Sequence, residues 1–205
     1  MRERFKEDLE QVKSISKEIM AYVISSYDKL SQYIEKSDEA ILKDILDIKE
    51  DIRRKATSLE RLSYELMALQ QPVAKDLKLL QMAMKLASSY KRIGGHFEQI
   101  SLILMDYSLN ESEKDYVNKL IENEKKMAID SIDSFIEIDK KLARKTIEAD
   151  KINNDLFKDA VEFIARENKN DLISPVELAE KVLLYKYFER LGDRLARVGD
   201  LATRL

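Results

Sequence analysis

The scarcity of glycine and proline is the feature that most restricts how this chain can fold. Only four glycines and two prolines occur in 205 residues, well below the average use of either residue in globular proteins. A sheet protein needs a turn about every ten residues, and this chain cannot supply turn residues at that rate. Charged residues make up 37% of the sequence and apolar residues 44%. Together these observations predict an all-α protein built from long amphipathic helices.

Breaks in the apolar pattern divide the first half of the chain into three helices. From Phe5 to Tyr33, apolar and small residues recur at alternating spacings of four and three, which is typical of a coiled-coil-like seam that could lie in an interface between two copies. A second helix follows Ser37-Asp38 and carries apolar residues as far as Leu69. We expect Pro72 to hold the preceding residue extended and to open the first turn of a third helix.

Capping signals mark three further helices in the second half. Asn110 and Glu113 form a capping pair that begins a fourth helix, and a fifth spans residues 139–167. Residues 168–171 are polar and predict a loop. Ser174-Pro175-Val176-Glu177 combines an N-cap, a first-turn proline and a capping glutamate, and so begins a sixth helix.

The six predicted helices fall into two sets of three. An offset of 98 residues superposes the segment Lys91–His96 on Glu189–Arg194, and three of the four glycines lie in these two segments. Internal repeats of this kind indicate stacked copies of one structural unit. The sequence therefore predicts two tandem three-helix bundles, residues 1–108 and 109–205.

Acidic side chains interrupt an apolar face of the sixth helix. Glu189 and Asp193 are four residues apart, and like charges at this spacing destabilise a helix unless a cation intervenes. If the fifth and sixth helices are antiparallel around residue 171, Asp150 faces position 192 and Asn154 faces position 188. Three carboxylates and an amide would then form an oxygen-only site, which suits Mg²⁺, Mn²⁺, Ca²⁺ or iron better than zinc or copper.

The same residues have a plainer interpretation. Arg190, Arg194 and Arg197 share the sixth helix with these acids, and in a chain this rich in charge most acidic pairs lie on solvated faces with salt bridges. The acidic cluster is then a set of ion pairs, and the protein is a structural helical adaptor that binds no metal.

Composition excludes several classes of protein. The chain has no cysteine and one histidine, His96, which excludes disulfides, thiolate metal sites and iron–sulfur clusters. A net charge of −3 argues against nucleic-acid binding. No apolar run approaches the length of a membrane span, and the charged N-terminus lacks the core of a signal peptide. We therefore expect a cytoplasmic protein.

Two segments resemble the PhoU family of phosphate-uptake regulators. Residues 69–77, Leu-Gln-Gln-Pro-Val-Ala-Lys-Asp-Leu, together with Lys91–His96, resemble the first repeat of that family, and Tyr187–Asp193 resembles the second. The resemblance covers the whole chain and implies two three-helix bundles. It also implies acidic motifs on the second and third helices of each bundle that bind multinuclear metal clusters, commonly iron, with manganese or magnesium as alternatives here.

Carried over by position, the resemblance implies one metal site, in the second repeat. Its ligands would be these five residues: Asp150, Asn154, Glu189, Asp193 and Asp200. In the first repeat, Lys49, Arg53, Lys91 and Gly95 stand where acidic residues are expected. That site cannot hold a cation, and its charges could hold an anion or be neutralised by neighbours such as Glu50 and Asp51.

The resemblance also implies a role. A family member would be a regulatory adaptor, not an enzyme, that engages the ATPase of the phosphate-specific ABC transporter at the membrane surface and a sensor kinase. An alternative is a carboxylate-bridged di-iron enzyme, which requires Glu-x-x-His on two helices. No such motif occurs, because Ile93 stands three residues before the only histidine.

Overall fold

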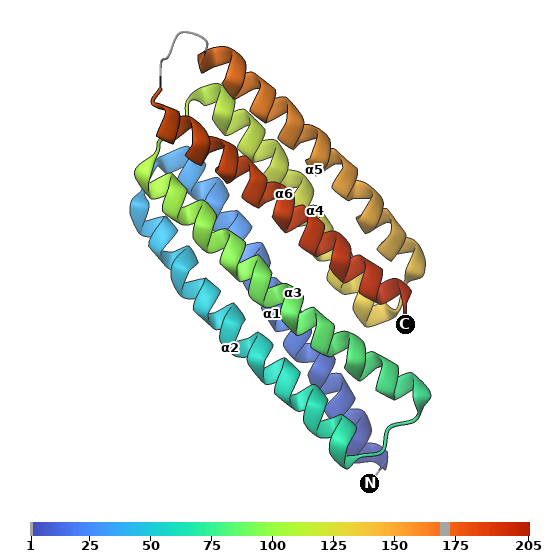
Figure 1. The fold of residues 1–205 in the computed structure, drawn as a ribbon. Helices are drawn as coiled ribbons and strands as arrows, with labels where there is room; N and C mark the ends of the chain where they lie inside the picture. Colours follow the sequence, from blue (N-terminus) through green and yellow to red (C-terminus); the bar gives the residue numbers. More distant parts are fainter. Residues whose placement is uncertain (1, 169–172) are drawn as a thin grey trace.

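The computed structural model describes residues 2–168 and 173–205, and within these ranges the chain is helical (Figure 1). The first three helices are α1 (Arg2–Lys36), α2 (Glu39–Leu69) and α3 (Ala74–Asp106). The next three are α4 (Glu111–Glu137), α5 (Lys140–Glu167) and α6 (Pro175–Thr203). The all-α prediction and the duplicated arrangement of helices are confirmed.

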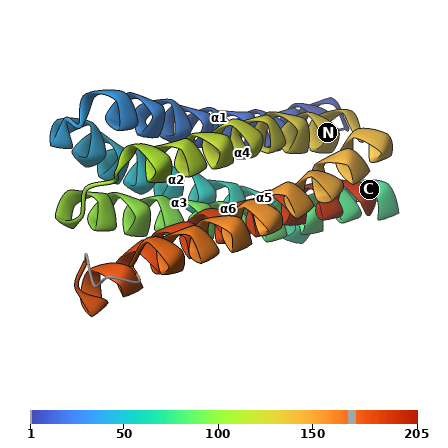
Figure 2. The same cartoon turned by 90° about the horizontal axis from the view of Figure 1, so that it is seen from above.

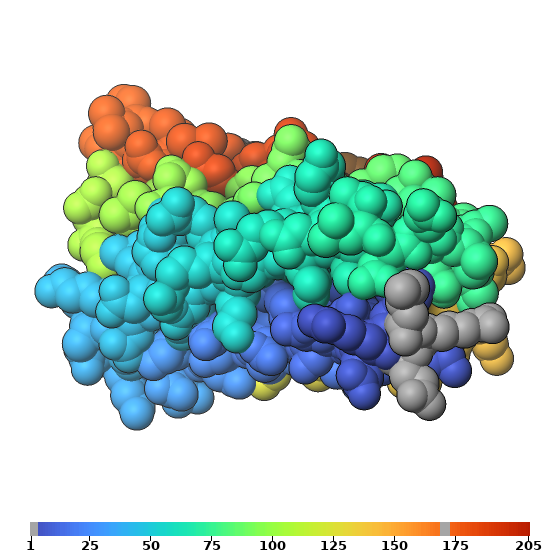
Figure 3. Space-filling model, turned by 90° about the horizontal axis from the view of Figure 1, so that it is seen from below, coloured from blue at the N-terminus to red at the C-terminus, as the bar shows by residue number. Residues whose placement is uncertain are grey.

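The helices run side by side in two bundles along the long axis of the molecule (Figure 2). Helices α1, α2 and α3 pack against one another, and so do α4, α5 and α6. The two bundles meet through α1 against α4 and α3 against α6. Helix α2 lies on the outside of the first bundle, where it forms much of the face shown in Figure 3. No helix within the described ranges is long and apolar enough to cross a membrane.

The ends of most helices follow the capping signals. The Asn110 side chain accepts a hydrogen bond from Glu113 N, and the Glu113 carboxylate accepts one from Asn110 N, so the predicted capping box is complete. The Ser174 side chain caps α6 by accepting from the Glu177 N–H at 3.1 Å. The loop predicted at residues 168–171 lies almost wholly outside the described residues.

The prediction for Pro72 is wrong. Helix α3 begins at Ala74, with Val73 as its N-cap, so Pro72 lies before the helix. Gln71 is not extended but left-handed, with φ of 45°. It directly follows Gln70, the C-cap of α2, and a left-handed residue at that place is a common way to end a helix. Proline shortly after a C-cap marks the end of α2 because it cannot continue the helix.

The apolar seam of α1 is buried within the chain. Leu9, Val12, Ile19, Val23 and Leu30 are all buried, and they belong to one hydrophobic core that extends through both bundles. The sequence analysis suggested that this seam could lie in an interface between two copies. Because its residues are buried within one chain, the seam is not available for such an interface. Its burial is instead what joins α1 to its own bundle and to α4.

A buried polar contact crosses between the bundles. The Tyr27 hydroxyl on α1 donates a hydrogen bond of 2.9 Å to Glu124 Oε2 on α4, and both residues are fully buried. The Tyr27 ring packs edge-on against Phe97 with ring centres 4.8 Å apart. An ion pair between Lys125 and Asp28 joins the same two helices nearer the surface. The interface is thus fixed by polar bonds as well as by apolar packing.

Candidate functional site: an acidic cluster in the second bundle

Acidic side chains from three helices meet inside the second bundle. Glu124 comes from α4, Asp150 from α5, and Glu189 and Asp193 from α6. Glu124 is fully buried, Glu189 is 9% exposed, and Asp150 is partly buried. The charges of Asp193 and Glu189 act on Asp150, and those of Asp150 and Glu189 act on Glu124. The sequence prediction that Asp150, Glu189 and Asp193 lie together is consistent with this arrangement.

Gly192 sets the distance between α5 and α6 at this level. A Cβ atom placed on Gly192 would lie 2.7 Å from Asp150 Oδ1 and would overlap the amide of Asn153. Only a residue without a side chain allows Asp150 to occupy this position. Residues 150 and 192 therefore face each other, as the antiparallel register predicted.

Three carboxylate oxygens of the cluster are buried without a hydrogen-bond partner among the described residues. They are Glu124 Oε1, Asp150 Oδ1 and Glu189 Oε2. A buried polar atom left unpaired costs free energy, so each of the three calls for an explanation.

Burial and the neighbouring charges raise the pKa of two members of the cluster. Burial, followed by the charge of Asp193, raises the pKa of Asp150 to about 6, although a hydrogen bond from Asn154 opposes the change. Burial is also the main reason that the pKa of Glu124 lies well above its usual value, and the hydrogen bond from Tyr27 offsets this only in part. A neighbouring positive charge would therefore stabilise the ionised form of both carboxyl groups.

Basic side chains already neutralise part of the cluster. Lys186 Nζ lies 2.6 Å from Glu189 Oε1, and Arg190 lies 3.3 Å from Asp193 Oδ2 and 3.8 Å from Glu189 Oε2. Within residues 2–168 and 173–205, no group of three or more acidic or histidine side chains is arranged to hold a metal ion. Asp150 and Glu124 are the two acids of the cluster that form no ion pair with a basic side chain among these residues, and Glu124 is bound by the Tyr27 hydroxyl.

Two of the predicted ligands make hydrogen bonds or ion pairs of their own. Asn154 donates hydrogen bonds of 3.1 Å to both the backbone oxygen and Oδ2 of Asp150, so it supports that carboxylate. Asp200 forms ion pairs with Arg197 and, at 2.9 Å, with Arg204. It follows Asp193 by seven residues, or roughly 10 Å of helix. The structure does not bring Asp200 to the cluster.

The sequence analysis missed Glu124 and Asn153. Glu124 stands at a core position of α4, between the buried Ile121 and Ala128, so its place in the apolar period was a usable signal. Asn153 is fully buried and accepts a hydrogen bond of 2.7 Å from Asn123 Nδ2. Nothing in the local sequence shows that Asn153, and not its neighbour Asn154, is the buried residue. The structure shows it through the close approach of Asn153 to Gly192.

At the corresponding positions of the first repeat, the basic side chains are neutralised by ion pairs. Lys49 binds Glu50 at 2.9 Å and Glu98 at 3.0 Å. Lys91 lies 2.6 Å from Glu60, and Arg53 also pairs with Glu50. A Cβ on Gly95 would meet nothing within 4 Å. These four positions therefore form neither a cation site nor a free cationic pocket, and Asp51 pairs with Arg54 instead.

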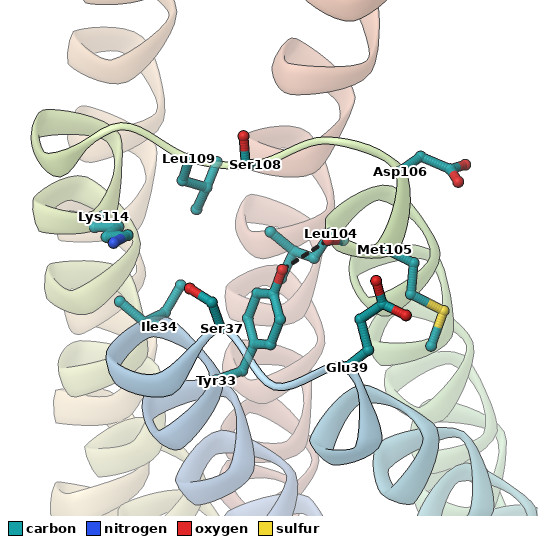
Figure 4. Close-up of a pocket in the computed structure, with 10 residues that line it drawn as sticks. All are labelled: Tyr33, Ile34, Ser37, Glu39, Leu104, Met105, Asp106, Ser108, Leu109 and Lys114. Atoms are coloured by element: carbon teal, nitrogen blue, oxygen red, sulfur yellow. Dashed lines mark hydrogen bonds between the residues drawn. The ribbon is translucent and has the colours of Figure 1, made fainter.

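A separate pocket of about 320 Å³ lies at one end of the first bundle, where α1 turns into α2 and α3 leads to α4 (Figure 4). The Tyr33 hydroxyl donates a hydrogen bond of 2.7 Å to Leu104 O inside it. Glu39, Asp106 and Lys114 also line the pocket. None of the predicted site residues contributes to it.

The sequence relatives agree with this architecture. The family described as "PhoU domain" matches residues 16–104 and 117–203. The chain is 25% identical over 202 residues to "Phosphate-specific transport system accessory protein PhoU homolog 1" of Methanothermobacter thermautotrophicus, covering 97% of this chain and 90% of that protein. It is 30% identical over 155 residues to the PhoU homolog of Aquifex aeolicus, covering 75% of this chain and 70% of that protein. Both relatives are named as accessory proteins and not as enzymes, so the di-iron enzyme alternative is set aside.

Solved structures share the fold. The crystal structure of PhoU from Pseudomonas aeruginosa superposes with a TM-score of 0.89 at 19% identity, covering 97% of this chain and 96% of that one. The structure of the phosphate transport system regulatory protein PhoU from Streptococcus pneumoniae gives 0.86 at 17% identity, covering 97% and 94%. With two copies of the domain spanning most of its length and the same arrangement of helices, this chain belongs to the PhoU family.

Proposed function

We propose that the protein is an accessory regulator of phosphate transport that acts by binding the ATPase of a phosphate-specific ABC transporter. The observation that carries the proposal is the match of both repeats to the PhoU domain, together with relatives named as accessory proteins of the phosphate-specific transport system. Long helices with polar outer faces offer a surface for such a partner. A sensor kinase is a second partner of the same proposal.

The transporter role is tested by co-purification. The full chain, tagged, is mixed with the transporter ATPase from the same source, and the complex is measured by size-exclusion chromatography. We expect a complex with the phosphate-transporter ATPase and none with an ATPase of an unrelated ABC transporter. Equal binding to both, or to neither, would contradict the proposal.

We further propose that one cation, iron or else manganese or magnesium, binds in the second bundle on Asp150, Glu189 and Asp193. The support is the donor set, which consists of oxygens alone, and the two unpaired oxygens Asp150 Oδ1 and Glu189 Oε2. When bound, the ion would supply positive charge to the cluster and connect α5 to α6. Lys186 and Arg190 would have to give up their ion pairs with Glu189 and Asp193.

Elemental analysis of the purified, untagged protein tests the cation. We expect about one equivalent of metal in the wild type and a loss in the double variant Glu189→Gln/Asp193→Asn. Asp200→Asn is the matched control, because Asp200 lies on the same helix and is paired with arginines outside the cluster. This control should keep its metal.

The metal-free adaptor is the competing function, and the pairs Lys186–Glu189 and Arg190–Asp193 favour it. It predicts no stoichiometric metal in any of these proteins. It also predicts that chelator leaves the complex with the transporter ATPase unchanged. Absence of stoichiometric metal removes the cation proposal and leaves the transporter proposal standing, whereas a complex unchanged by chelator shows only that the metal is not needed for binding the ATPase.

A further inference from the structure

Basic side chains from both repeats meet where α3 packs against α6. Arg92 and His96 are four residues apart on α3, and Arg190 and Arg194 are four residues apart on α6, so each pair shares one face of its helix. The His96 ring packs at a tilt of 34° against the Tyr187 ring of α6, with ring centres 5.9 Å apart. This contact places the two pairs on either side of the junction between the bundles.

Polar atoms at this junction lack partners. His96 Nε2 on α3 and Arg194 Nε on α6 are both buried without a hydrogen bond to any described residue. Neither Arg92 nor Arg194 forms an ion pair within residues 2–168 and 173–205, whereas Arg190 pairs with Asp193. A buried polar atom without a partner needs one from outside the described residues, and here there is one such atom on each side of the interface.

The charges at the junction are unbalanced. Arg92 on α3 lies close enough to Arg194 on α6 for the two charges to act on each other, and the charge of Asp193 acts on Arg194 in the opposite sense. Burial and then the charges of Arg194, Arg190 and Arg92 lower the pKa of His96 to about 4, so the imidazole is neutral near pH 7. Arg190 is paired with Asp193 and with Glu189, so the guanidinium groups without an ion pair beside the neutral histidine are those of Arg92 and Arg194. Like charges this close repel one another unless an anion lies between them.

We propose that Arg92, His96 and Arg194 form a binding site for a tetrahedral oxyanion, of which inorganic phosphate is the probe. Guanidinium groups bind such oxyanions through paired N–H donors, and the buried Nε of Arg194 and Nε2 of His96 would each find a partner. The anion would contact both repeats at once and so hold α3 to α6. The site needs no metal, and it does not depend on the transporter proposal.

Isothermal titration calorimetry with inorganic phosphate tests the site on the full chain after removal of metals with chelator. We expect one phosphate per chain in a chloride buffer. Arg194→Gln should weaken binding about tenfold or more, the scale of one lost charge-assisted hydrogen bond. Arg194→Lys should recover only part of the affinity because it restores the charge without the paired donors. Arg144→Gln is the matched control, since it removes the same charge from an exposed position on α5.

The melting temperature gives a second measurement of phosphate binding, and it does not depend on the heat of binding that calorimetry records. Phosphate should raise the Tm of the wild type and of Arg144→Gln, because a ligand that binds only the folded state stabilises it. Without phosphate, Arg194→Gln should be as stable as the wild type or more so, since it removes a repelling charge. A folded variant that loses only the phosphate response supports the site.

Three outcomes would overturn the proposal. Absence of phosphate binding by the wild type would mean that water or a partner's acidic side chain meets these groups. An equal loss of phosphate affinity in Arg194→Gln and Arg144→Gln would mean that phosphate binding depends on the net charge of the protein alone. Binding that appears only when metal is present would place the phosphate on the cation of the acidic cluster instead.

Discussion

Glu124 is the residue whose burial has the clearest consequence for stability. Its pKa is raised by burial and by the charges of Asp150 on α5 and Glu189 on α6, while the hydroxyl of Tyr27 on α1 opposes the rise. A carboxyl group with a raised pKa binds more protons in the folded than in the unfolded state. Its contribution to stability is therefore complete below its ordinary value of 4.5 and declines as the pH rises toward the folded pKa.

Glu124→Gln should remove this decline. Glutamine is uncharged, can still accept the hydrogen bond from Tyr27, and offers an N–H₂ group where Glu124 Oε1 has no partner. We expect a gain of about 1–3 kcal/mol in the free energy of unfolding at pH 7, the cost of one unsatisfied buried group. Urea unfolding of variant and wild type from pH 4 to 8 measures the difference.

Glu122→Gln provides the control, because Glu122 is exposed on the same helix. It should stay within about 0.5 kcal/mol of the wild type at every pH. If the free energy of unfolding varies with pH in the same way for the wild type and for Glu124→Gln, Glu124 is not the cause of the pH dependence.

Gly95 is a second position where one added methyl group should change the stability of the protein. It lies within α3, and an added Cβ would meet nothing within 4 Å. Gly95→Ala should therefore stabilise the protein by about 1 kcal/mol, the difference in helix propensity. Thermal and urea unfolding would each register the gain, and a loss of stability would mean that the space beside Gly95 is occupied.

At the scale of helices, the pair α5 and α6 depends on Gly192. Gly192→Ala would push against Asp150 and the fully buried Asn153, so we expect a loss of about 1–3 kcal/mol, typical of an overpacked core. Gly94 is the equivalent position of the first repeat, where an added Cβ would lie 3.5 Å from its nearest neighbours. Gly94→Ala should be neutral or slightly stabilising in the same urea experiment, and equal effects at both glycines would contradict this account.

The ends of helices show what local sequence can and cannot determine. The capping box of Asn110 and Glu113 was predictable because all its atoms lie within four residues. Pro72 was misread because the same residue type occurs both at the start of a helix and after its end. The deciding fact was the left-handed conformation of Gln71, which ends α2 and has no signal in the residue type itself.

Across the whole molecule, the bond between Tyr27 and Glu124 joins the two repeats. Tyr27→Phe keeps the ring against Phe97 but leaves the Glu124 carboxyl with no described partner. We expect a loss of about 1–3 kcal/mol in the free energy of unfolding. The double variant Tyr27→Phe/Glu124→Gln completes a thermodynamic cycle, and additive effects would show that the bond contributes nothing to the interface.

Long-range pairing is also what the sequence could not reveal. The fold class, the duplication and the facing of Asp150 and position 192 followed from periodicity and register. The bond of Glu124 to Tyr27 did not, because the two residues are 97 positions apart. The same holds for Lys49 with Glu98 and Lys91 with Glu60, since a charge on a helix does not show which helix will face it.

The bond across the bundles has a consequence for how the protein is made. The first repeat leaves the ribosome before the second, and domains generally fold in that order. Until α4 is complete, the Tyr27 hydroxyl lacks its acceptor, and the faces of α1 and α3 that later cover the second bundle are open to water. A nascent chain arrested after residue 108 should therefore bind chaperones or aggregate. Release of the remaining 97 residues should end that exposure, which pulse proteolysis of stalled chains can measure.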